Sequence, residues 1–393
     1  MSFPWSVLSR HQFKSPGSGS YVVALGAADD SQLAASVAAA EGSLEILDLK
    51  SLKPVRSIKK PHGCEAPEDL AFMPFGTSTS STAPPLSSVV ATCGKDGSAK
   101  LWDLRAHGSD PAKTLLEPGK DAATSIAMTP DGKLCAVGVG PRIKLLDLAS
   151  GKVLLTHEDA HSDNVAKLRF RSSKRNGLEL VSSGDDGLLC CLDVERCLEG
   201  GRAVEDDSGL RLVINAGEAA RVLTLFGEDS FAVASISTTE ALQLWSLREA
   251  EDGGKAGTSC GLFEQLRSDE RLAVSETDGY IVDVIYDEAS ERLFSLAGDI
   301  KGGLSIFHLN MEAAEYVTKI PGSGHTAVVR SMLPLASGSG SSRFVSAGED
   351  GRVCIWATKS LESILAGEED DVPPVQGSKW NQQRPSKKPR WKK

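Results

Sequence analysis

The segment that decides the fold of this chain reads Gly324-His325, then Ser346, then Gly348-Glu349-Asp350-Gly351, then Trp356. A segment upstream carries equivalent residues at His161, Ser182, Asp186 and Leu192. In both segments the Ser follows the His by 21 positions, the Asp follows it by 25, and the Trp or Leu follows it by 31. This matched spacing indicates one structural unit used twice. A unit of this size cannot bury its own apolar face, so the sequence predicts an array of such units.

Seven segments share one template, in which an apolar strand, a turn and a second apolar strand end in a Trp-Asp-like pair. They are Leu33–Leu49, Val89–Leu104, Leu134–Leu148, Leu178–Val194, Phe231–Leu247, Arg292–Leu309 and Phe344–Ala357. Three of the turns contain Asp-Gly, which is a strong hairpin signal because such turns need positive φ. The chain lacks the amphipathic stretches of about 10–15 residues that a parallel sheet with helices would need. We therefore expect an all-β fold, a seven-bladed β-propeller whose strands pack on both faces.

The connections and the ends of the chain complete this prediction. The template segments are spaced more widely than a lean repeat of about 40–45 residues, and we expect the excess in loops at Gly76–Ser88, Glu251–Cys260 and Ala336–Ser342. Trp5–Phe13 precedes the first template strand and is expected to close the ring by pairing with the last blade. The propeller should span residues 1–366. Residues 367–393, which are rich in charge and Pro, should form a disordered tail, acidic first and then basic.

At Gly324-His325, Gly348–Gly351 and Trp102-Asp103 the chain resembles the WD40-repeat family, over roughly residues 5–365. Several stretches are similar to one branch of that family, that of WD repeat-containing protein 89. They are 161–170 with 181–189, 280–309, and 324–331 with 346–351, together with a Lys/Arg-rich C-terminus. The resemblance implies an interaction scaffold and no reaction. The chain departs from the family pattern in that only the second, fourth and seventh blades keep a recognisable His and Asp, and the fourth has lost its Trp.

The resemblance implies that the His, the Ser or Thr, the Asp and the Trp of one blade form a hydrogen-bonded chain. The sets here are His325, Ser346, Asp350 and Trp356; His161, Ser182 and Asp186; and His62, Thr92, Asp96 and Trp102. Such a chain pairs every buried polar group and so stiffens the blade. His325, Ser346 and Asp350 also have the residue types of a nucleophilic triad. Because the set recurs at matched spacing, as architecture does and active sites rarely do, we interpret it as structural and expect no catalytic residue and no enzyme.

Composition and motifs give no sign of a metal or cofactor site. The seven His show no ligand spacing, and the eight Cys contain no C-x-x-C pair, so we expect buried thiols in a reducing compartment. The Gly-rich stretches lack the phosphate-loop pattern, and the acidic turns do not match a calcium loop. The N-terminus has no apolar signal region, and no run approaches about 18 apolar residues. The sequence thus predicts an intracellular protein with no cofactor and no membrane contact.

Three turn residues are candidate contacts for a partner protein. Lys95, Asp185 and Glu349 each precede the Asp of a hydrogen-bonded set. In the family that this chain resembles, that position points to the narrow face around the central channel, where partners often dock. The resemblance therefore implies that these side chains contact another protein.

The charge of the chain is unevenly distributed. Residues 379–393 hold seven cations and no acid, so removing their +7 from the net charge of −10 leaves −17 for the rest of the chain. The segment Lys387-Lys388-Pro389-Arg390, with Lys392 and Lys393, fits a short basic nuclear-import pattern, and Trp380 and Trp391 lie among the cations. Two Trp side chains among seven cations also suit stacking on unpaired bases. The alternative interpretation is a terminus that only aids solubility.

These observations predict a non-catalytic scaffold that holds other proteins inside the cell, as a monomeric propeller within a complex. We expect it in the nucleus, with a cytoplasmic fraction as well. A second function stays open, in which the protein is an RNA-associated or ribosome-assembly factor whose basic tail binds nucleic acid.

Overall fold

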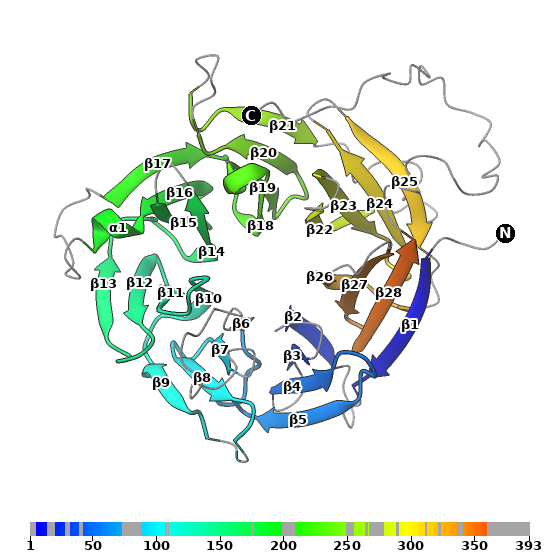
Figure 1. Ribbon diagram of the computed structural model, residues 1–393, viewed down its shortest axis with the longest axis horizontal. Coiled ribbons are helices and arrows are strands. Elements are labelled where there is room, and N and C mark those ends of the chain that lie inside the picture. The colour runs from blue at the N-terminus through cyan, green and yellow to red at the C-terminus, as the bar shows by residue number, and fades with distance from the viewer. Residues whose placement is uncertain are drawn as a thin grey trace.

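Seven antiparallel sheets of four strands each are arranged around a common centre (Figure 1). The computed structural model describes residues 5–13, 20–27, 32–38, 42–72, 89–106, 108, 110–173, 177–198, 209–248, 255–263, 266, 279–287, 291–310, 313–320, 324–335 and 341–359. The first strand of each blade lies next to the centre, and the later strands follow outward. The prediction of an all-β, seven-bladed propeller is confirmed.

The strands of the seven blades are as follows, from the inner strand outward. Blade 1 contains β2 (Tyr21–Ala27), β3 (Gln32–Ala38), β4 (Ser43–Asp48) and β5 (Pro54–Lys59). Blade 2 contains β6 (Asp69–Phe72), β7 (Val89–Cys93), β8 (Ala99–Asp103) and β9 (Lys113–Leu116). Blade 3 contains β10 (Ala123–Met128), β11 (Leu134–Val139), β12 (Arg142–Asp147) and β13 (Val153–His157). Blade 4 contains β14 (Val165–Ser173), β15 (Gly177–Gly184), β16 (Leu188–Asp193) and β17 (Leu210–Asn215). Blade 5 contains β18 (Ala220–Phe226), β19 (Ala232–Ser237), β20 (Leu242–Ser246) and β21 (Ser259–Phe263). Blade 6 contains β22 (Tyr280–Asp287), β23 (Arg292–Gly298), β24 (Leu304–Leu309) and β25 (Ala314–Ile320). Blade 7 contains β26 (Val329–Leu335), β27 (Ser341–Gly348), β28 (Arg352–Lys359) and β1 (Trp5–Gln12).

In the part of the chain that the structure describes, two short helices interrupt this pattern of strands. The helix α1 (Val194–Cys197) follows β16, and Asp193 caps it by accepting a hydrogen bond from the Arg196 amide at 2.9 Å. A 3-10 turn, η4 (Glu228–Ser230), joins β18 to β19. The sequence analysis predicted neither of these helices.

The seven template segments are the second and third strands of the seven blades. The Trp-equivalent positions of the template are Leu47, Trp102, Leu146, Leu192, Trp245, Phe307 and Trp356. In the same order, these third-strand residues lie opposite Leu33, Val90, Cys135, Leu180, Val233, Ser295 and Phe344 of the second strands. Two predicted loops are wrong at their ends, since Ser259 and Cys260 belong to β21, and Ser341 and Ser342 belong to β27. Ser259 pairs with β20, and Ser341 and Ser342 pair with β28, despite a composition typical of loops.

The ring is closed by the N-terminal strand, as predicted. β1 pairs antiparallel with β28, in a register that runs from Trp5 opposite Thr358 to Gln12 opposite Arg352. Beyond the strand, the Phe13 amide donates to the Gly351 carbonyl at 2.9 Å. This pairing supplies the outer strand of blade 7 and covers what would otherwise be the open edge of β28.

The core lies between the blades. Among the described residues, seven clusters of buried apolar side chains occur, one between each pair of neighbouring blades. Between blades 2 and 3, for example, Leu101 and Cys93 pack against Val137 and Leu146. Each blade therefore buries both of its faces only when two neighbours are present, which is why the units cannot fold singly.

Polar contacts also join the inner strands. The Ser125 hydroxyl of blade 3 donates to Asp69 of blade 2 at 2.9 Å and accepts from the Leu168 amide of blade 4 at 3.1 Å. Further round the ring, the Val329 amide of blade 7 donates to the Tyr280 hydroxyl of blade 6 at 2.6 Å. These contacts fix the spacing of neighbouring blades around the channel.

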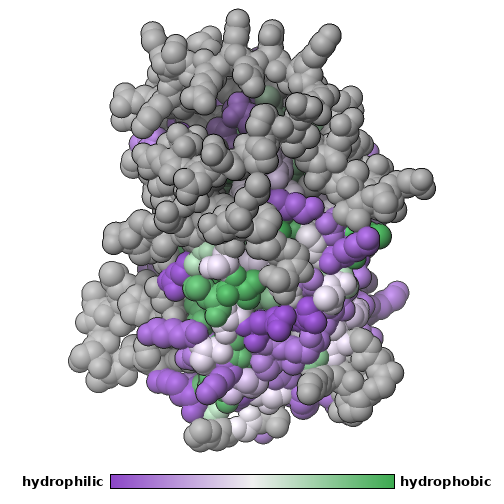
Figure 2. All heavy atoms as spheres, turned by 90° about the vertical axis from the view of Figure 1, so that its right-hand side faces the viewer, coloured by the Kyte–Doolittle hydropathy of each residue, from purple (hydrophilic) through white to green (hydrophobic). Residues whose placement is uncertain are grey.

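The outer surface carries isolated apolar side chains. Figure 2 shows the side of the ring that carries β1 and β25, where the described surface is mostly hydrophilic around a small hydrophobic group. Leu8 of β1 is 59% exposed, and Val55 of β5 is 61% exposed. Single exposed apolar side chains of this kind are ordinary on soluble proteins and mark no docking site by themselves.

The described part of the propeller runs from Trp5 to Lys359. The predicted boundary at residue 366 and the predicted tail, residues 367–393, lie outside the described residues.

Candidate interaction face

The four polar residues of blade 7 form one continuous hydrogen-bonded chain. The Trp356 indole donates to the Ser346 hydroxyl at 2.7 Å, and that hydroxyl lies 2.7 Å from His325 Nε2. His325 Nδ1 lies 3.1 Å from Asp350. A neutral His325 with its proton on Nδ1 satisfies every member, since Ser346 then donates to Nε2 and Nδ1 donates to the carboxylate. His325, Ser346 and Trp356 are buried and the Asp350 side chain is only 5% exposed, so the polar groups of the set are shielded from solvent.

Blade 2 repeats the arrangement with Thr in place of Ser. The Thr92 hydroxyl accepts from the Trp102 indole at 2.8 Å and lies 2.8 Å from His62 Nε2. His62 Nδ1 lies 3.0 Å from Asp96 and 2.9 Å from the Ser98 hydroxyl. Ser98 is an additional member that the sequence analysis did not single out.

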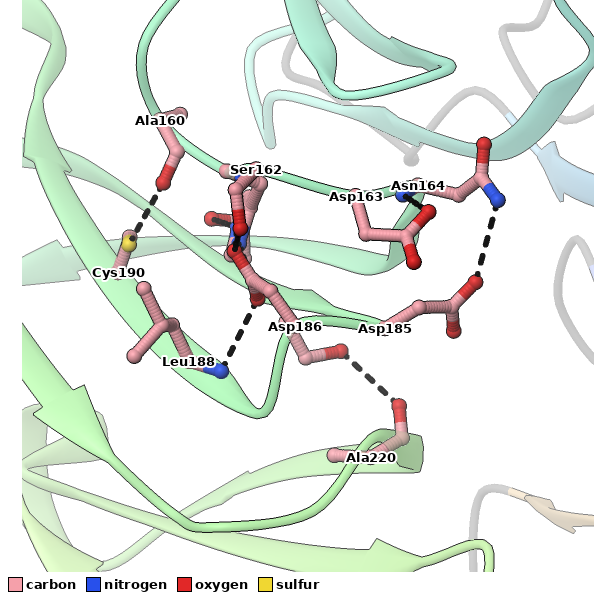
Figure 3. A network of polar contacts seen from close by, with 12 residues as sticks. Ala160, Ser162, Asp163, Asn164, Asp185, Asp186, Leu188, Cys190 and Ala220 are labelled. Carbon is pink, nitrogen blue, oxygen red and sulfur yellow. Dashed lines mark hydrogen bonds and ion pairs between the residues drawn. The ribbon is translucent and has the colours of Figure 1, made fainter.

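Blade 4 has three members of the set, and its Trp position is occupied by buried Leu192. His161 lies 2.8 Å from the Ser182 hydroxyl and 3.0 Å from Asp186. Figure 3 shows this corner, where the Leu188 amide, at 3.0 Å, donates to Asp186. Ser182 therefore forms a hydrogen bond with only one member of its set, whereas Ser346 of blade 7 forms hydrogen bonds with two.

The Asp carboxylates of the three sets are held in the ionised form. Burial alone would raise the pKa of Asp350, but hydrogen bonds from His325 and the Thr326 amide outweigh it, and the pKa lies below the ordinary value of 3.8. For Asp186 as well, burial alone would raise the pKa, but hydrogen bonds lower it more, so its pKa also lies below the ordinary value. For His62, burial lowers the pKa more than the charge of Asp96 raises it, so the neutral imidazole is favoured.

Blade 5 holds a different polar set that the sequence analysis missed. The Trp245 indole donates to the Gln243 side chain at 3.3 Å, and Gln243 donates in turn to the Ala216 carbonyl at 3.1 Å. The Thr239 hydroxyl, at the position of the missing Asp, donates to Glu218 of the preceding loop. In blade 5 the acid lies before the inner strand and its donor lies in the turn before the third strand, whereas in blades 2, 4 and 7 the donor comes first and the acid lies in that turn. A search for a His followed by an Asp therefore does not find this pair.

The three predicted contact residues lie at the same end of the ring, on the turns that lead into the third strands of blades 2, 4 and 7. Lys95 forms ion pairs with Glu68 at 3.4 Å and Glu65 at 3.9 Å. Glu349 accepts a hydrogen bond from Arg330 at 2.8 Å. Asp185 accepts only a long hydrogen bond, 3.4 Å, from the Asn164 side chain (Figure 3). All three side chains are exposed, and Asp185 has no ion pair with any described residue.

A cavity of about 260 Å³ opens beside Asp185, where the inner strands β10, β14 and β18 begin. Its polar lining consists of Glu68, Thr124, Lys167, Asp185, Arg221 and Thr238. Val165, Ala166 and Ala220 supply its apolar lining. The cavity therefore lies at the mouth of the central channel, on the face that carries the predicted contacts. Of its polar residues, the sequence analysis identified only Asp185, because the others carry no motif.

The cations at the channel mouth are largely neutralised by neighbouring acceptors. Lys167 lies 3.4 Å from Asp69, and Arg221 lies 3.1 Å from Glu240. On the inner strand β22, burial raises the pKa of Asp283 to about 6, although the Val284 amide and the charges of Arg169 and Arg221 lower it. The mouth thus presents acids to solvent while its cations are engaged.

Other chemistry is sparse in the described part of the chain. No group of three or more His, Cys, Asp or Glu side chains is placed there to hold a metal ion. All eight Cys are free thiols, of which Cys64 is exposed. Burial raises the pKa of Cys190 and of Cys354 to about 12, which keeps these thiols protonated. None of the described helices has the length and hydrophobicity needed to cross a bilayer.

The similarity of this chain to known proteins agrees with the fold and with the hydrogen-bonded sets described above. A family model described as WD domain, G-beta repeat matches residues 56–103 and 316–357, the two segments that contain the complete sets of blades 2 and 7. The chain is 25% identical to the WD repeat-containing protein 89 homolog of Dictyostelium discoideum over 285 residues, 71% of each chain. It is 26% identical to the WD repeat-containing protein GTS1 of Arabidopsis thaliana over 277 residues, 68% of this chain and 66% of that protein. It is 27% identical to an uncharacterized WD repeat-containing protein of Schizosaccharomyces pombe over 187 residues, 44% of this chain and 55% of that protein. With its seven blades and its repeated hydrogen-bonded sets, the chain is a β-propeller that contains WD40 repeats in blades 2 and 7 and is similar over most of its length to WD repeat-containing proteins.

Proposed function

We propose that this protein is a non-catalytic scaffold that binds other proteins through the face at the mouth of its channel, and that it works in the nucleus. The fold supports the first part, since WD40 propellers typically hold protein partners. The observation that carries the choice of face is Asp185, an exposed carboxylate beside a cavity, with no ion pair to a described residue. Such a group gains a charge-assisted hydrogen bond when a partner supplies a donor.

The three predicted contacts differ in what they contribute. Reversing the charge of Lys95 would place three acids together, because Glu65 and Glu68 already surround it. Glu349 is engaged by Arg330. Asp185 is the side chain whose change should affect a partner most and the fold least.

The test is affinity capture of the full chain from nuclear extract, with each partner then purified and its Kd measured. Asp185→Lys should weaken binding of a direct partner at least about tenfold, equivalent to about 1.4 kcal/mol. Glu195→Lys is the matched control, because Glu195 is exposed and follows β16 at its other end, whereas Asp185 precedes it. Equal loss in both variants, or none in a folded Asp185→Lys protein, would contradict the proposed face.

Nuclear location is proposed from Lys387, Lys388, Arg390, Lys392 and Lys393, which fit a basic import signal. The same segment favours a second candidate function, binding of RNA in ribosome assembly or a related process. Its support is the interleaving of Trp380 and Trp391 with seven cations. RNA affinity that falls steeply with salt and disappears when residues 379–393 are removed would favour this second function. A protein partner that stays bound after that removal would favour the first.

A further inference from the structure

The turn that joins β18 to β19 in blade 5 has an unusual backbone. Asp229 and Ser230 of η4 have φ angles of 55° and 50°, in a region that residues other than Gly rarely adopt. Among the described residues, they are the only adjacent non-glycine residues with positive φ. Both are under strain, because at positive φ a Cβ atom comes too close to the following carbonyl oxygen. A strained turn of this kind persists only where the surrounding structure determines it.

One side chain of the neighbouring blade reaches this turn. Arg171, near the end of β14 in blade 4, donates a hydrogen bond to the Ser230 carbonyl at 2.7 Å. Only 4% of Arg171 is exposed, and β14 and η4 pack against each other. The Arg171 Nε has no acceptor among the described residues, so the guanidinium depends on the Ser230 carbonyl and on its ion pair with Glu179. Arg171 therefore holds the turn from outside the blade to which the turn belongs.

Arg171 shares its carboxylate with a second cation. Glu179 of β15 is fully buried and forms ion pairs with Arg171 and with Arg211 of β17. Arg211 also donates to the Leu247 carbonyl of blade 5 at 3.1 Å. The network thus contains two cations and one anion, and each cation contacts a backbone carbonyl of blade 5. Removing either Arg leaves Glu179 in a balanced ion pair, so blade 4 should keep its fold.

The turn also holds two aromatic side chains together. Phe226 and Phe231 lie at its two ends, with ring centroids 6.3 Å apart, and Phe226 lies equally far from Tyr286 of blade 6. The Arg248 guanidinium covers the Phe231 ring at 4.1 Å from its centroid. The other contact of that ring is with Gly227, where a Cβ atom would lie 2.2 Å from it. A rearrangement of the turn would therefore move Phe231 away from Phe226, which is now only 1% exposed.

We propose that the β18–β19 turn is a lid that Arg171 holds shut. The closed arrangement is strained and latched, and a relaxed arrangement, in which Phe231 leaves Phe226, forms when the bond to the Ser230 carbonyl is lost. The lid lies at the end of the ring opposite the channel mouth, because β18 begins at the mouth and ends at Phe226. Its opening would expose aromatic surface there, independently of the proposed partner face.

Hydrogen exchange of the full chain, read by mass spectrometry, compares two matched variants. Arg171→Met and Arg211→Met each remove one guanidinium, keep an apolar stem and leave Glu179 with one cation. Arg171→Met should speed exchange of the Ser230 amide, which donates to the Gly227 carbonyl at 3.0 Å, by about tenfold or more. Arg211→Met should leave that amide near the parent rate, because the latch is intact. The amides of β3 and β4 in blade 1 report whether either variant loosens the whole ring.

Ser230→Gly tests the strain without touching the latch. Gly adopts positive φ freely, and the relief of strain exceeds the conformational entropy that Gly loses on folding. The change should therefore raise the melting temperature of the parent protein. In the Arg171→Met background the turn is already relaxed, so the same change should raise the melting temperature little. The two substitutions should thus be non-additive, as expected of coupled sites.

Three results would overturn the proposal. They are equal acceleration of the Ser230 amide in the two Arg variants, acceleration spread evenly over the blades, and a lower melting temperature for Ser230→Gly in the parent protein. The last result needs no change at Arg171, so it decides against the lid even if Arg171→Met fails to fold.

Discussion

Single side chains in the hydrogen-bonded sets contribute different amounts to the stability of the fold, because they form hydrogen bonds with different numbers of partners. The Ser346 hydroxyl accepts a hydrogen bond from Trp356 and forms another with His325. The Ser182 hydroxyl forms a hydrogen bond with His161, and its blade has no Trp at the equivalent position. Asp350 and Asp186 each engage a His and two backbone amides. A buried network of this kind adds stability only while every member is paired.

Asp350→Ala should destabilise the protein by about 2–4 kcal/mol, since it leaves His325 Nδ1 and two amides without their acceptor. The measurement is the midpoint of thermal or denaturant unfolding. Asp163→Ala is the control, because Asp163 is exposed and accepts only from the neighbouring Asn164 amide. A midpoint for Asp350→Ala within error of the control would remove the claim that the set stabilises blade 7.

Ser346→Ala and Ser182→Ala form a natural pair for measuring the contribution of the indole. The first removes the partner of both Trp356 and His325, whereas the second removes the partner of His161 alone. With about 1 kcal/mol for each lost hydrogen bond, Ser346→Ala should cost roughly twice as much as Ser182→Ala. Equal free energies of unfolding for the two variants would show that the indole bond contributes nothing.

Asp283 gives a pH dependence with a definite sign. Burial raises the pKa of its carboxyl from 3.8 to about 6 in the folded protein. Because the folded protein holds the proton of Asp283 more tightly than the unfolded chain does, the protonated carboxyl stabilises the fold. This contribution is fully present below pH 3.8 and is lost as the pH rises through about 6. Asp283→Asn should therefore raise the melting temperature at pH 8 relative to the parent and give no such gain at pH 4. The difference between the two proteins, measured from pH 4 to 8, isolates this group from the other carboxyls. A difference that does not change with pH would contradict the assignment.

Among the elements, the second and third strands of each blade were predictable, and the inner strands were less so. Asp-Gly turns and the Trp-equivalent register identify the former from short spacings. The inner strands carry contacts that depend on neighbouring blades, such as Asp69 with Ser125, which are 56 positions apart. Local patterns cannot reveal such pairs, and the same is true of Arg221 and Glu240 at the channel mouth. The exchanged acid and donor in blade 5 were missed because Glu218 and Thr239 match no motif.

The closing strand β1 can be tested by deletion. Removing residues 1–12 leaves the backbone groups of β28 unpaired along an exposed edge and uncovers the apolar cluster between blades 6 and 7. We expect a lower melting temperature and self-association. Size-exclusion chromatography with light scattering at several concentrations measures the second effect. A monomeric variant that melts with the parent would mean that blade 7 is stable with three strands.

For the molecule as a whole, the basic segment should be separable from the propeller. Removing residues 379–393 should leave the melting temperature unchanged, because no described strand lies beyond β28. It should also shift the protein from nucleus to cytoplasm if the import signal acts as proposed. Imaging of a fluorescent fusion too large for passive entry, with and without the segment, measures this. Equal nuclear accumulation of the two forms would end the targeting hypothesis.

The pairing of β1 with β28 also has a consequence for the time at which the protein matures on the ribosome. Gln12 and Arg352 are 340 positions apart, so β1 emerges long before its partner strand exists. At about 5–20 residues per second, the wait is about 17–70 seconds. Throughout that interval both edges of the unfinished ring lack a neighbour, and an unpaired strand edge is a template for pairing with other chains. Slower translation should therefore lower the yield of native protein, and earlier synthesis of the last blade, by circular permutation, should raise it.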